Sequence, residues 1–107
     1  MKMDKILKQA QKMQAQMTLA QQELDNARIT GTAGGGAVNA IVTGSGDIVS
    51  IKLTKDAVDA EDLEMLEDLL VVAIKDAQEK AKNESEKKMN AVSGGLNAFG
   101  GGFGGLF

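Results

Sequence analysis

An uninterrupted apolar repeat near the start of the chain is the feature that most constrains its fold. Eight residues follow one another at alternating intervals of three and four: Met3, Ile6, Ala10, Met13, Met17, Ala20, Leu24 and Ala27. This heptad spacing places all of them on one side of an α-helix, in the stripe that packs against a partner helix in a coiled coil. The repeat therefore predicts one helix over residues 3–28. Such a helix is roughly 39 Å long, so part of it is expected to project as an arm.

A second helical pattern occupies the later part of the chain. Asp59 is the expected N-cap, and Asp62 falls in the first turn, where an acid suits the positive end of the helix dipole. The same spacing then returns at Leu63, Leu66, Leu70, Ala73 and Ala77. Further apolar residues widen this stripe, so the start of the helix is expected to pack on a sheet while its far end projects. The helix is expected to end at Gly94-Gly95.

Three short segments between the helices have the composition and alternation of β-strands. They span residues 28–33, 37–43 and 48–53, and glycine-rich turns at residues 34–36 and 44–47 separate them. One face of the second segment carries Val38, Ala40 and Val42, and one face of the third carries Val49, Ile51 and Leu53. The sequence thus predicts an α+β fold with a long N-terminal helix, a three-stranded antiparallel meander and a long C-terminal helix.

A single domain is expected over residues 1–93, followed by a glycine- and phenylalanine-rich tail over residues 94–107 that is expected to be disordered. One helix cannot cover both faces of a three-stranded sheet, and an edge strand remains bare. We therefore expect a dimer with a shared sheet and projecting helical arms. The residues expected in the core or in the dimer seam are Met13, Met17, Leu24, Val38, Val42, Leu66 and Leu70.

The composition leaves little room for catalysis or metal binding. The 107 residues include no His, Cys, Trp, Tyr or Pro. The acidic run from Asp56 to Asp68 has no apolar surroundings that would raise a carboxyl pKa, and it lacks the spacing and central glycine of an EF-hand. The Gly34–Gly36 turn lacks the Lys-Ser/Thr of a phosphate-binding loop. No enzymatic activity, cofactor or metal is therefore expected, and function should lie in the surfaces of the protein.

Lysines gather at the outer ends of both predicted helices, although the formal net charge is −3. On the first helix, four of them fall within about 120° of one another, on the side away from the apolar stripe: Lys2, Lys5, Lys8 and Lys12. Such a row on an exposed arm suits contacts with DNA phosphates, and an ordinary solvated helix face is the alternative. Near the end of the second helix, Lys82, Lys87 and Lys88 alternate with glutamates, so pairing within the helix explains them equally well.

Direct reading of DNA bases is not expected from this composition. Arg28 is the only arginine and lies at a helix–strand junction, and the aromatic residues are confined to the tail. Without further arginines or a stacking platform, contact with the backbone of duplex DNA is favoured over base readout or single-strand binding.

Several segments, in this order, carry a resemblance to a known family. They are QAQKMQAQM at 9–17, QEL at 22–24, TGTAGGGAV at 30–38, GSGDIVSIKL at 44–53, EDLEMLEDLLVVAIKDAQEK at 61–80 and KMNAVSGGL at 88–96. With them the chain resembles the YbaB/EbfC family of bacterial nucleoid-associated proteins. The resemblance implies a homodimer with tweezer-like helical arms, binding of double-stranded DNA with low sequence specificity, and association with the nucleoid. Because no apolar run reaches the length of a signal peptide or a membrane span, a cytoplasmic protein is expected.

Two alternatives remain open at this stage. Helical arms around a β-meander also suit a holdase-like module that grips a polypeptide and binds no DNA. Apolar residues at the arm tips would favour that function, whereas lysines favour DNA. The role of the tail, with Phe99, Phe103 and Phe107, is likewise open between an inert segment and one that promotes self-association.

Overall fold

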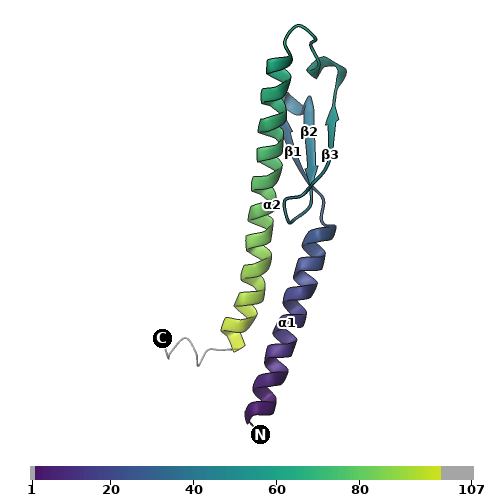
Figure 1. Ribbon diagram of the computed structural model, residues 1–107. Coiled ribbons are helices and arrows are strands. Elements are labelled where there is room, and N and C mark those ends of the chain that lie inside the picture. Colours follow the sequence, from purple (N-terminus) through teal and green to yellow (C-terminus); the bar gives the residue numbers. More distant parts are fainter. Residues whose placement is uncertain (1, 100–107) are drawn as a thin grey trace.

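The computed structural model describes residues 2–99 and, for side chains, residues 2–92. Helix α1 (Lys2–Asn26) is followed by strands β1 (Ile29–Ala33), β2 (Val38–Val42) and β3 (Ile48–Leu53) and by helix α2 (Leu63–Phe99). Short 3₁₀ turns lie at Gly34–Gly36 and Lys55–Ala57. The predicted order of helix, three strands and helix is confirmed. The molecule is elongated, with principal extents of 72 × 25 × 16 Å (Figure 1).

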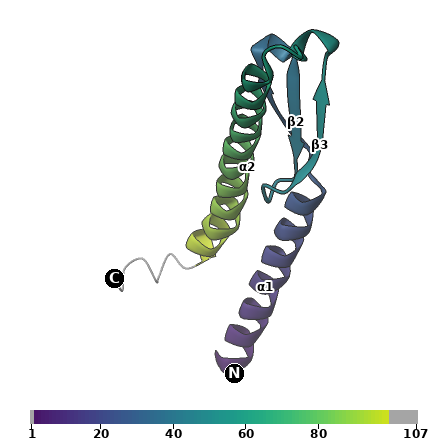
Figure 2. The ribbon, with the colours of Figure 1, turned by 45° about the horizontal axis from the view of Figure 1, so that its top comes forward.

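Helix α2 runs along most of the molecule. Its first half lies against the sheet and its second half lies beside α1 (Figures 1 and 2). Because α1 runs toward the sheet and α2 runs away from it, the two helices are antiparallel and their free ends lie at the same end of the molecule. This arrangement produces the two projecting arms that the lengths of the helical patterns predicted.

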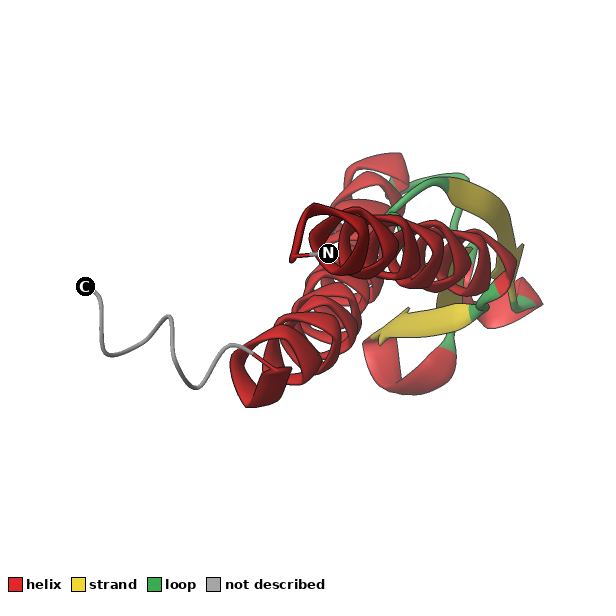
Figure 3. Ribbon diagram, turned by 90° about the horizontal axis from the view of Figure 1, so that it is seen from below, coloured by secondary structure: helices red, strands yellow, loops and turns green. Residues whose placement is uncertain are grey.

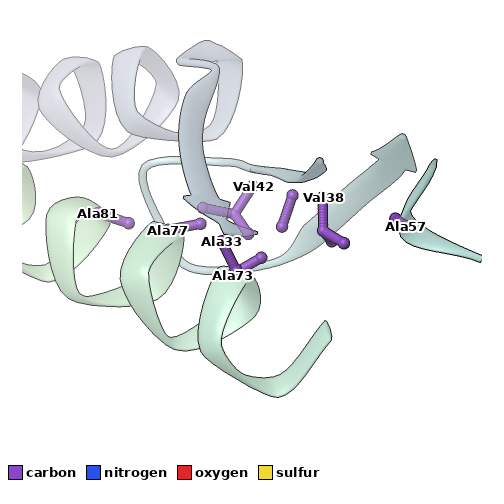
Figure 4. Packing of buried hydrophobic residues seen from close by; sticks show 8 residues of the cluster. Ala33, Val38, Val42, Ala57, Ala73, Ala77 and Ala81 are labelled. Atoms are coloured by element: carbon purple, nitrogen blue, oxygen red, sulfur yellow. The ribbon is translucent and has the colours of Figure 1, made fainter. Parts of the chain in front are cut away.

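The core lies between α2 and one face of the sheet, whose strand order is β1-β2-β3 with both pairs antiparallel. Alternation along β2 buries Val38, Ala40 and Val42 completely, as the sequence pattern predicted. Helix α2 meets them with alanines spaced four residues apart, at Ala73, Ala77 and Ala81 (Figure 4). The core is therefore built mainly from small side chains, and α2 lies close to the sheet.

Helix α2 approaches the sheet closely at Gly31 of β1. A Cβ atom at this position would lie 2.2 Å from the backbone nitrogen of Ala77 and 2.4 Å from the carbonyl oxygen of Ala73. Both atoms belong to the helix backbone and cannot rotate away. Glycine is thus required here because of the helix–strand spacing.

Strand β3 has a bulge that changes which residues share the core-facing side. Val42 is opposite Ile48, but Ile41 is opposite Ser50, so Val49 is the extra residue. Residues opposite each other in an antiparallel pair point to the same face. Ile48, Ile51 and Leu53 therefore lie on the side of α2, so the bulge adds Ile48 to the face that Ile51 and Leu53 share. Because α2 covers β1 and β2, these three side chains are 52%, 38% and 44% exposed.

The outer edge of β1 is closed by side chains of α2. The Thr32 backbone N–H donates to a carboxylate oxygen of Asp76 at 2.9 Å, and the Lys80 ammonium donates to the Thr30 carbonyl at 3.4 Å. Asp76 and Lys80 are themselves joined by an ion pair of 3.0 Å. The N–H bond from Thr32, and then Lys80, lower the pKa of Asp76 below its ordinary value. Strands β1 and β3 are both edge strands, and in the described part of the chain no strand lies beside the outer edge of β3.

The turn between β2 and β3 joins α1 to the sheet. The Gly44 N–H donates to the carbonyl of Leu24 in the last turn of α1 at 2.8 Å, and the Ser45 hydroxyl donates to the Asp25 carboxylate at 2.6 Å. Arg28 donates to the carbonyls of Asp25 and Ala27. These bonds occupy carbonyls that a helix end leaves free, and they fix the direction in which α1 leaves the sheet.

Two predicted helix boundaries are wrong. Helix α2 begins at Leu63, and its N-cap is Asp62, whose side chain accepts the Met65 N–H at 3.2 Å. Asp59 instead accepts the Glu61 N–H at 2.9 Å and forms an earlier turn. At its other end, α2 continues through Gly94-Gly95 to Phe99. Glycine lowers helix propensity without forbidding the helix, so these two residues do not stop it. The rest of the predicted tail, residues 100–107, lies outside the described residues.

Replacing Gly31 by alanine should lower the free energy of unfolding by more than ~3 kcal/mol, because the new methyl group would separate β1 from the backbone of α2. The matched control is Gly35→Ala. Gly35 has a φ of +67° but no atom within 4 Å of an added Cβ, so strain alone should cost about 1–2 kcal/mol. Urea unfolding followed by circular dichroism measures both. Equal losses in the two variants would contradict the close approach at Gly31.

Replacing Asp76 by asparagine should lower the melting temperature near neutral pH. A carboxyl group whose pKa is lowered in the folded state stabilises the fold above its unfolded pKa of about 3.9, and that stabilisation disappears as the pH falls through the lowered folded value. The difference in melting temperature between wild type and variant should therefore shrink as the pH is lowered from about 7 to about 2. Glu79→Gln, which removes an exposed carboxylate from the same helix, is the control. A difference independent of pH would exclude this role of the charge.

Candidate nucleic-acid interface

The lysines of α1 occupy the outer end of an arm. Lys2, Lys5, Lys8 and Lys12 are all exposed, and Asp4 is the only acid among the first twelve residues. Figure 3 looks along the molecule from the end where α1 begins and α2 ends, and the N-terminal end of α1 lies in front. Nothing in the described part of the chain packs over this lysine row, so an extended partner could reach all four ammonium groups from one side.

Among the described side chains, the residues of α1 that are buried lie in its inner half. Ala20 and Leu24 are buried, Met13 is half-buried, and Met17 is 49% exposed. Because the lysine row lies on a different side of the helix from this stripe, packing against α2 leaves the lysines free. The outer part of the stripe is exposed as well, with Met3 at 75% and Ile6 at 63%.

The lysines of α2 do not form a matching row. Lys88 is half-buried and makes an ion pair of 2.6 Å with Glu23 of α1, which holds the two arms together. Lys82 and Lys87 are exposed, but five positions separate them, which places them roughly 140° apart around the helix. The structure thus does not bring the α2 lysines together with the α1 row, because Lys82 lies beside the β2–β3 turn and Lys88 lies against Glu23, near the inner end of α1. Glu23, missed in the sequence analysis, lies too far from Lys88 in sequence for any local pattern to reveal the pair.

Acidic residues gather at the opposite end of the molecule. Seven exposed acids follow β3 and begin α2, with no base among them: Asp56, Asp59, Glu61, Asp62, Glu64, Glu67 and Asp68. The sheet lies between these acids and the free ends of the arms (Figure 1). The negative net charge is therefore concentrated away from the lysine row.

The residues predicted for the core or dimer seam fall into three groups. Leu24, Val38 and Val42 are buried, and Leu66 and Leu70 are half-buried beside the core. Met13 and Met17 instead line an open groove of about 610 Å³ between α1 and α2, together with Met89.

Two further properties of the described residues bear on the kind of site. No helix within residues 2–99 has the length and apolar character needed to cross a membrane. Within the same residues, no three His, Cys, Asp or Glu side chains come together in a way that would hold a metal ion.

Comparison with known proteins identifies the family. The YbaB/EbfC DNA-binding family matches residues 1–96. A nucleoid-associated protein of Lachnoclostridium phytofermentans is 49% identical over 105 residues, covering 98% of this chain and 87% of that protein. A nucleoid-associated protein of Saccharopolyspora erythraea is 47% identical over 104 residues, covering 97% and 89%.

The fold has a counterpart among solved structures. The crystal structure of an uncharacterized protein from Helicobacter pylori superposes with a TM-score of 0.61 at 19% identity, covering 73% of this chain and 90% of that one. At this identity the likeness concerns the fold alone. The match over residues 1–96 and the identity to two nucleoid-associated proteins are independent of it, and together they show that this chain belongs to the YbaB/EbfC DNA-binding family.

Proposed function

We propose that the protein is a homodimeric, nucleoid-associated DNA-binding protein of the cytoplasm that contacts duplex phosphates through Lys2, Lys5, Lys8 and Lys12. The observation that carries the proposal is the exposure of this lysine row at the end of an arm, far from the acidic residues. Each phosphate that a lysine neutralises releases condensed counterions, and this release favours binding whatever the base sequence of the DNA. No catalysed reaction is part of the proposal; the physical effect is to coat or bend DNA.

The length of the row suits a duplex. Ten residues separate Lys2 from Lys12, which corresponds to roughly 15 Å along the helix axis. Successive base pairs rise about 3.4 Å, so one row extends over roughly four base pairs. Lys87 is exposed and can add a contact at the margin, whereas Lys82 lies beside the β2–β3 turn and Lys88 is held by Glu23. With one lysine row from each chain of the proposed dimer, we expect about four to six phosphate contacts.

Low sequence specificity follows from which side chains are available. Arg28, the only arginine, donates to backbone carbonyls at the end of α1, so its guanidinium is engaged within the chain. Lysine binds phosphate as a point charge and lacks the bidentate geometry with which arginine reads guanine. The row therefore supports contacts that position the protein on DNA without reading its bases.

Strand β3 supports the proposed dimer. Its outer edge is unpaired in the described part of the chain, whereas the edge of β1 is closed by Asp76 and Lys80. Ile48, Ile51 and Leu53 are exposed beside this open edge, on the face that α2 covers at β1 and β2 but not at β3. An open edge next to exposed large apolar side chains is where a second copy would extend the sheet and bury the most apolar area.

Replacing Lys5, Lys8 and Lys12 together by glutamine should weaken DNA binding by at least tenfold, because three phosphate contacts per arm are lost. The measurement is fluorescence anisotropy of a labelled duplex of mixed sequence, between about 50 and 200 mM salt. For the wild type, the logarithm of affinity against that of salt should have a slope of about −4 to −5, similar for unrelated sequences. The slope of the variant should be shallower.

The matched control replaces Lys52, Lys55 and Lys75 by glutamine. These lysines are equally exposed but lie along the sheet half of the molecule, so the net charge changes equally while the arm stays intact. If both triple variants lose the same affinity, general charge and not the α1 row governs binding. If neither loses affinity, the row is not the site.

Replacing Ile51 by lysine should convert the proposed dimer to a monomer, because it would place a charge in the apolar contact beside β3. Sedimentation equilibrium should give twice the chain mass of 11.2 kDa for the wild type and the mass of a single chain for the variant. Val72→Lys is the control, since Val72 is 53% exposed but lies one helical turn before Asp76, on the β1 side of α2. A dimer that survives Ile51→Lys would exclude this contact.

A second candidate function is the binding of an unfolded polypeptide between the arms. The observation that favours it is the exposure of Met3, Ile6 and Leu7, at 75%, 63% and 58%, near the tip of α1. Suppression of aggregation of a denatured test protein, undisturbed by the Lys5, Lys8 and Lys12 substitutions, would support this candidate. The same lysine variant thus separates the two functions.

A further inference from the structure

Two glutamines share the side of α1 that carries the lysine row. Successive residues of an α-helix are turned by about 100°, so Gln9 and Gln16 fall inside the arc of about 120° that the four lysines span. Seven positions separate the two glutamines, which places them about 20° apart around the helix and roughly 10 Å apart along it. Lys2 lies on one side of this pair, and the other three lysines lie on its other side. The glutamines are therefore flanked by positive charge on both sides.

The described part of the chain leaves both glutamine side chains available to a ligand. They are exposed, and no residue of the described chain forms a hydrogen bond with either of them. Gln21, by contrast, donates to the carboxylate of Asp25 at 3.1 Å. The first acid within the lysine arc is Glu23, which is paired with Lys88. This side of α1 thus presents lysine and glutamine together, without an acid among them, from its outer end to Gln16.

The outer part of α1 is free to enter the major groove of a duplex. No side chain from Lys2 to Lys12 is buried by the rest of the described chain, so the helix is accessible around its circumference there. The major groove of B-DNA is about 12 Å wide and admits one α-helix. When the lysine row faces the DNA, the long lysine side chains reach the phosphates along the walls of the groove. The glutamines between them then face the base edges on its floor.

We infer that Gln9 and Gln16 bind adenine in the major groove and give the protein a modest preference for A·T base pairs. This role depends on the proposed function, because the lysine row must hold α1 against the duplex. A glutamine carboxamide carries an acceptor oxygen beside a donor nitrogen, and adenine presents the complementary pair, the N6 amino group as donor and N7 as acceptor. Guanine presents two acceptors at the same edge, so it offers no donor to the carboxamide oxygen.

The preference is small beside the electrostatic contribution to binding. The distance of roughly 10 Å between the glutamines corresponds to about three base-pair steps, so each glutamine meets a separate base pair. A well-formed pair of hydrogen bonds from one side chain to one base discriminates about fivefold or more against the wrong base. Two such contacts favour A·T-rich DNA without defining a long recognition sequence. Sequence specificity therefore stays low, because the lysine contacts with phosphates supply most of the affinity.

The test compares two duplexes of the same A·T sequence, one with adenine and one with 7-deazaadenine in its place. The modified base keeps its pairing with thymine but has a C–H group where N7 accepts a hydrogen bond. Fluorescence anisotropy at about 100 mM salt should show that the wild type binds the adenine duplex about fivefold more tightly. The Gln9→Ala/Gln16→Ala variant should bind the two duplexes equally well. It should also keep the salt dependence of the wild type, because no charge is removed, and alanine preserves the helix.

Gln11→Ala/Gln22→Ala is the matched control. Both residues are exposed glutamines of α1 that lie outside the lysine arc, so this variant should keep the wild-type preference. Equal binding of the two duplexes by the wild type would overturn the inference and leave the proposed function intact, and so would a preference that survives in Gln9→Ala/Gln16→Ala. If the wild type binds neither duplex at about 50 mM salt, the proposed function is refuted and this inference with it.

Discussion

The backbone of α2 lies directly against β1, and the rest of the structure depends on this contact. Gly31 on the strand and Ala73 and Ala77 on the helix leave no larger side chain between the two elements. Small side chains permit close packing, but they also limit the apolar area that the fold removes from water. Larger apolar residues remain on the outside, at β3 and at the outer end of α1. The single chain thus has a thin core and apolar surfaces that other segments or copies can cover.

The two ends of the molecule are coupled through α2 and through the joint at the end of α1. Helix α2 belongs to both halves, since it packs on the sheet first and on α1 later. The hydrogen bond from Gly44 to Leu24 ties the last turn of α1 to the β2–β3 turn, and the ion pair between Lys88 and Glu23 ties the helices together farther out. The outer part of α1 has no such tie among the described residues. The lysine row is therefore carried by the part of the arm that has the fewest contacts to keep it in place.

Local sequence patterns predicted the elements well, because each pattern has a period that only one kind of element satisfies. The alternation of Val38, Ala40 and Val42 defined β2 and its buried face, and the heptad spacing defined α1. The predictions failed where two local signals compete or where distant residues decide. Asp59 and Asp62 are both capping residues, and only the path of the chain selects Asp62. The bulge that turns Ile48 inward depends on pairing with β2.

The residues of the candidate interface likewise divide into those that a local pattern reveals and those that depend on distant parts of the chain. The lysine row was visible in the sequence because it follows helical periodicity, and the structure places all four lysines on an exposed arm. The ion pair of Lys88 could not be predicted from the sequence, because its partner Glu23 belongs to the other helix. The closure of the β1 edge by Asp76 and Lys80 joins residues more than forty positions apart, so no local pattern distinguishes it from an ordinary helical ion pair.

Net charge is a poor guide to DNA binding in a molecule of this shape. At physiological ionic strength, electrostatic interactions between exposed charges fade over about 8 Å, which is a small fraction of the 72 Å length of the protein. A duplex at the arm end therefore experiences the four lysines of α1 and the single nearby Asp4, and it is screened from the acids that begin α2. The net charge of −3 sums over both ends, and DNA bound at the proposed lysine row would meet one of them. Binding at the arm and a negative charge overall are compatible for this reason, and lowering the ionic strength strengthens the local attraction and the distant repulsion at the same time.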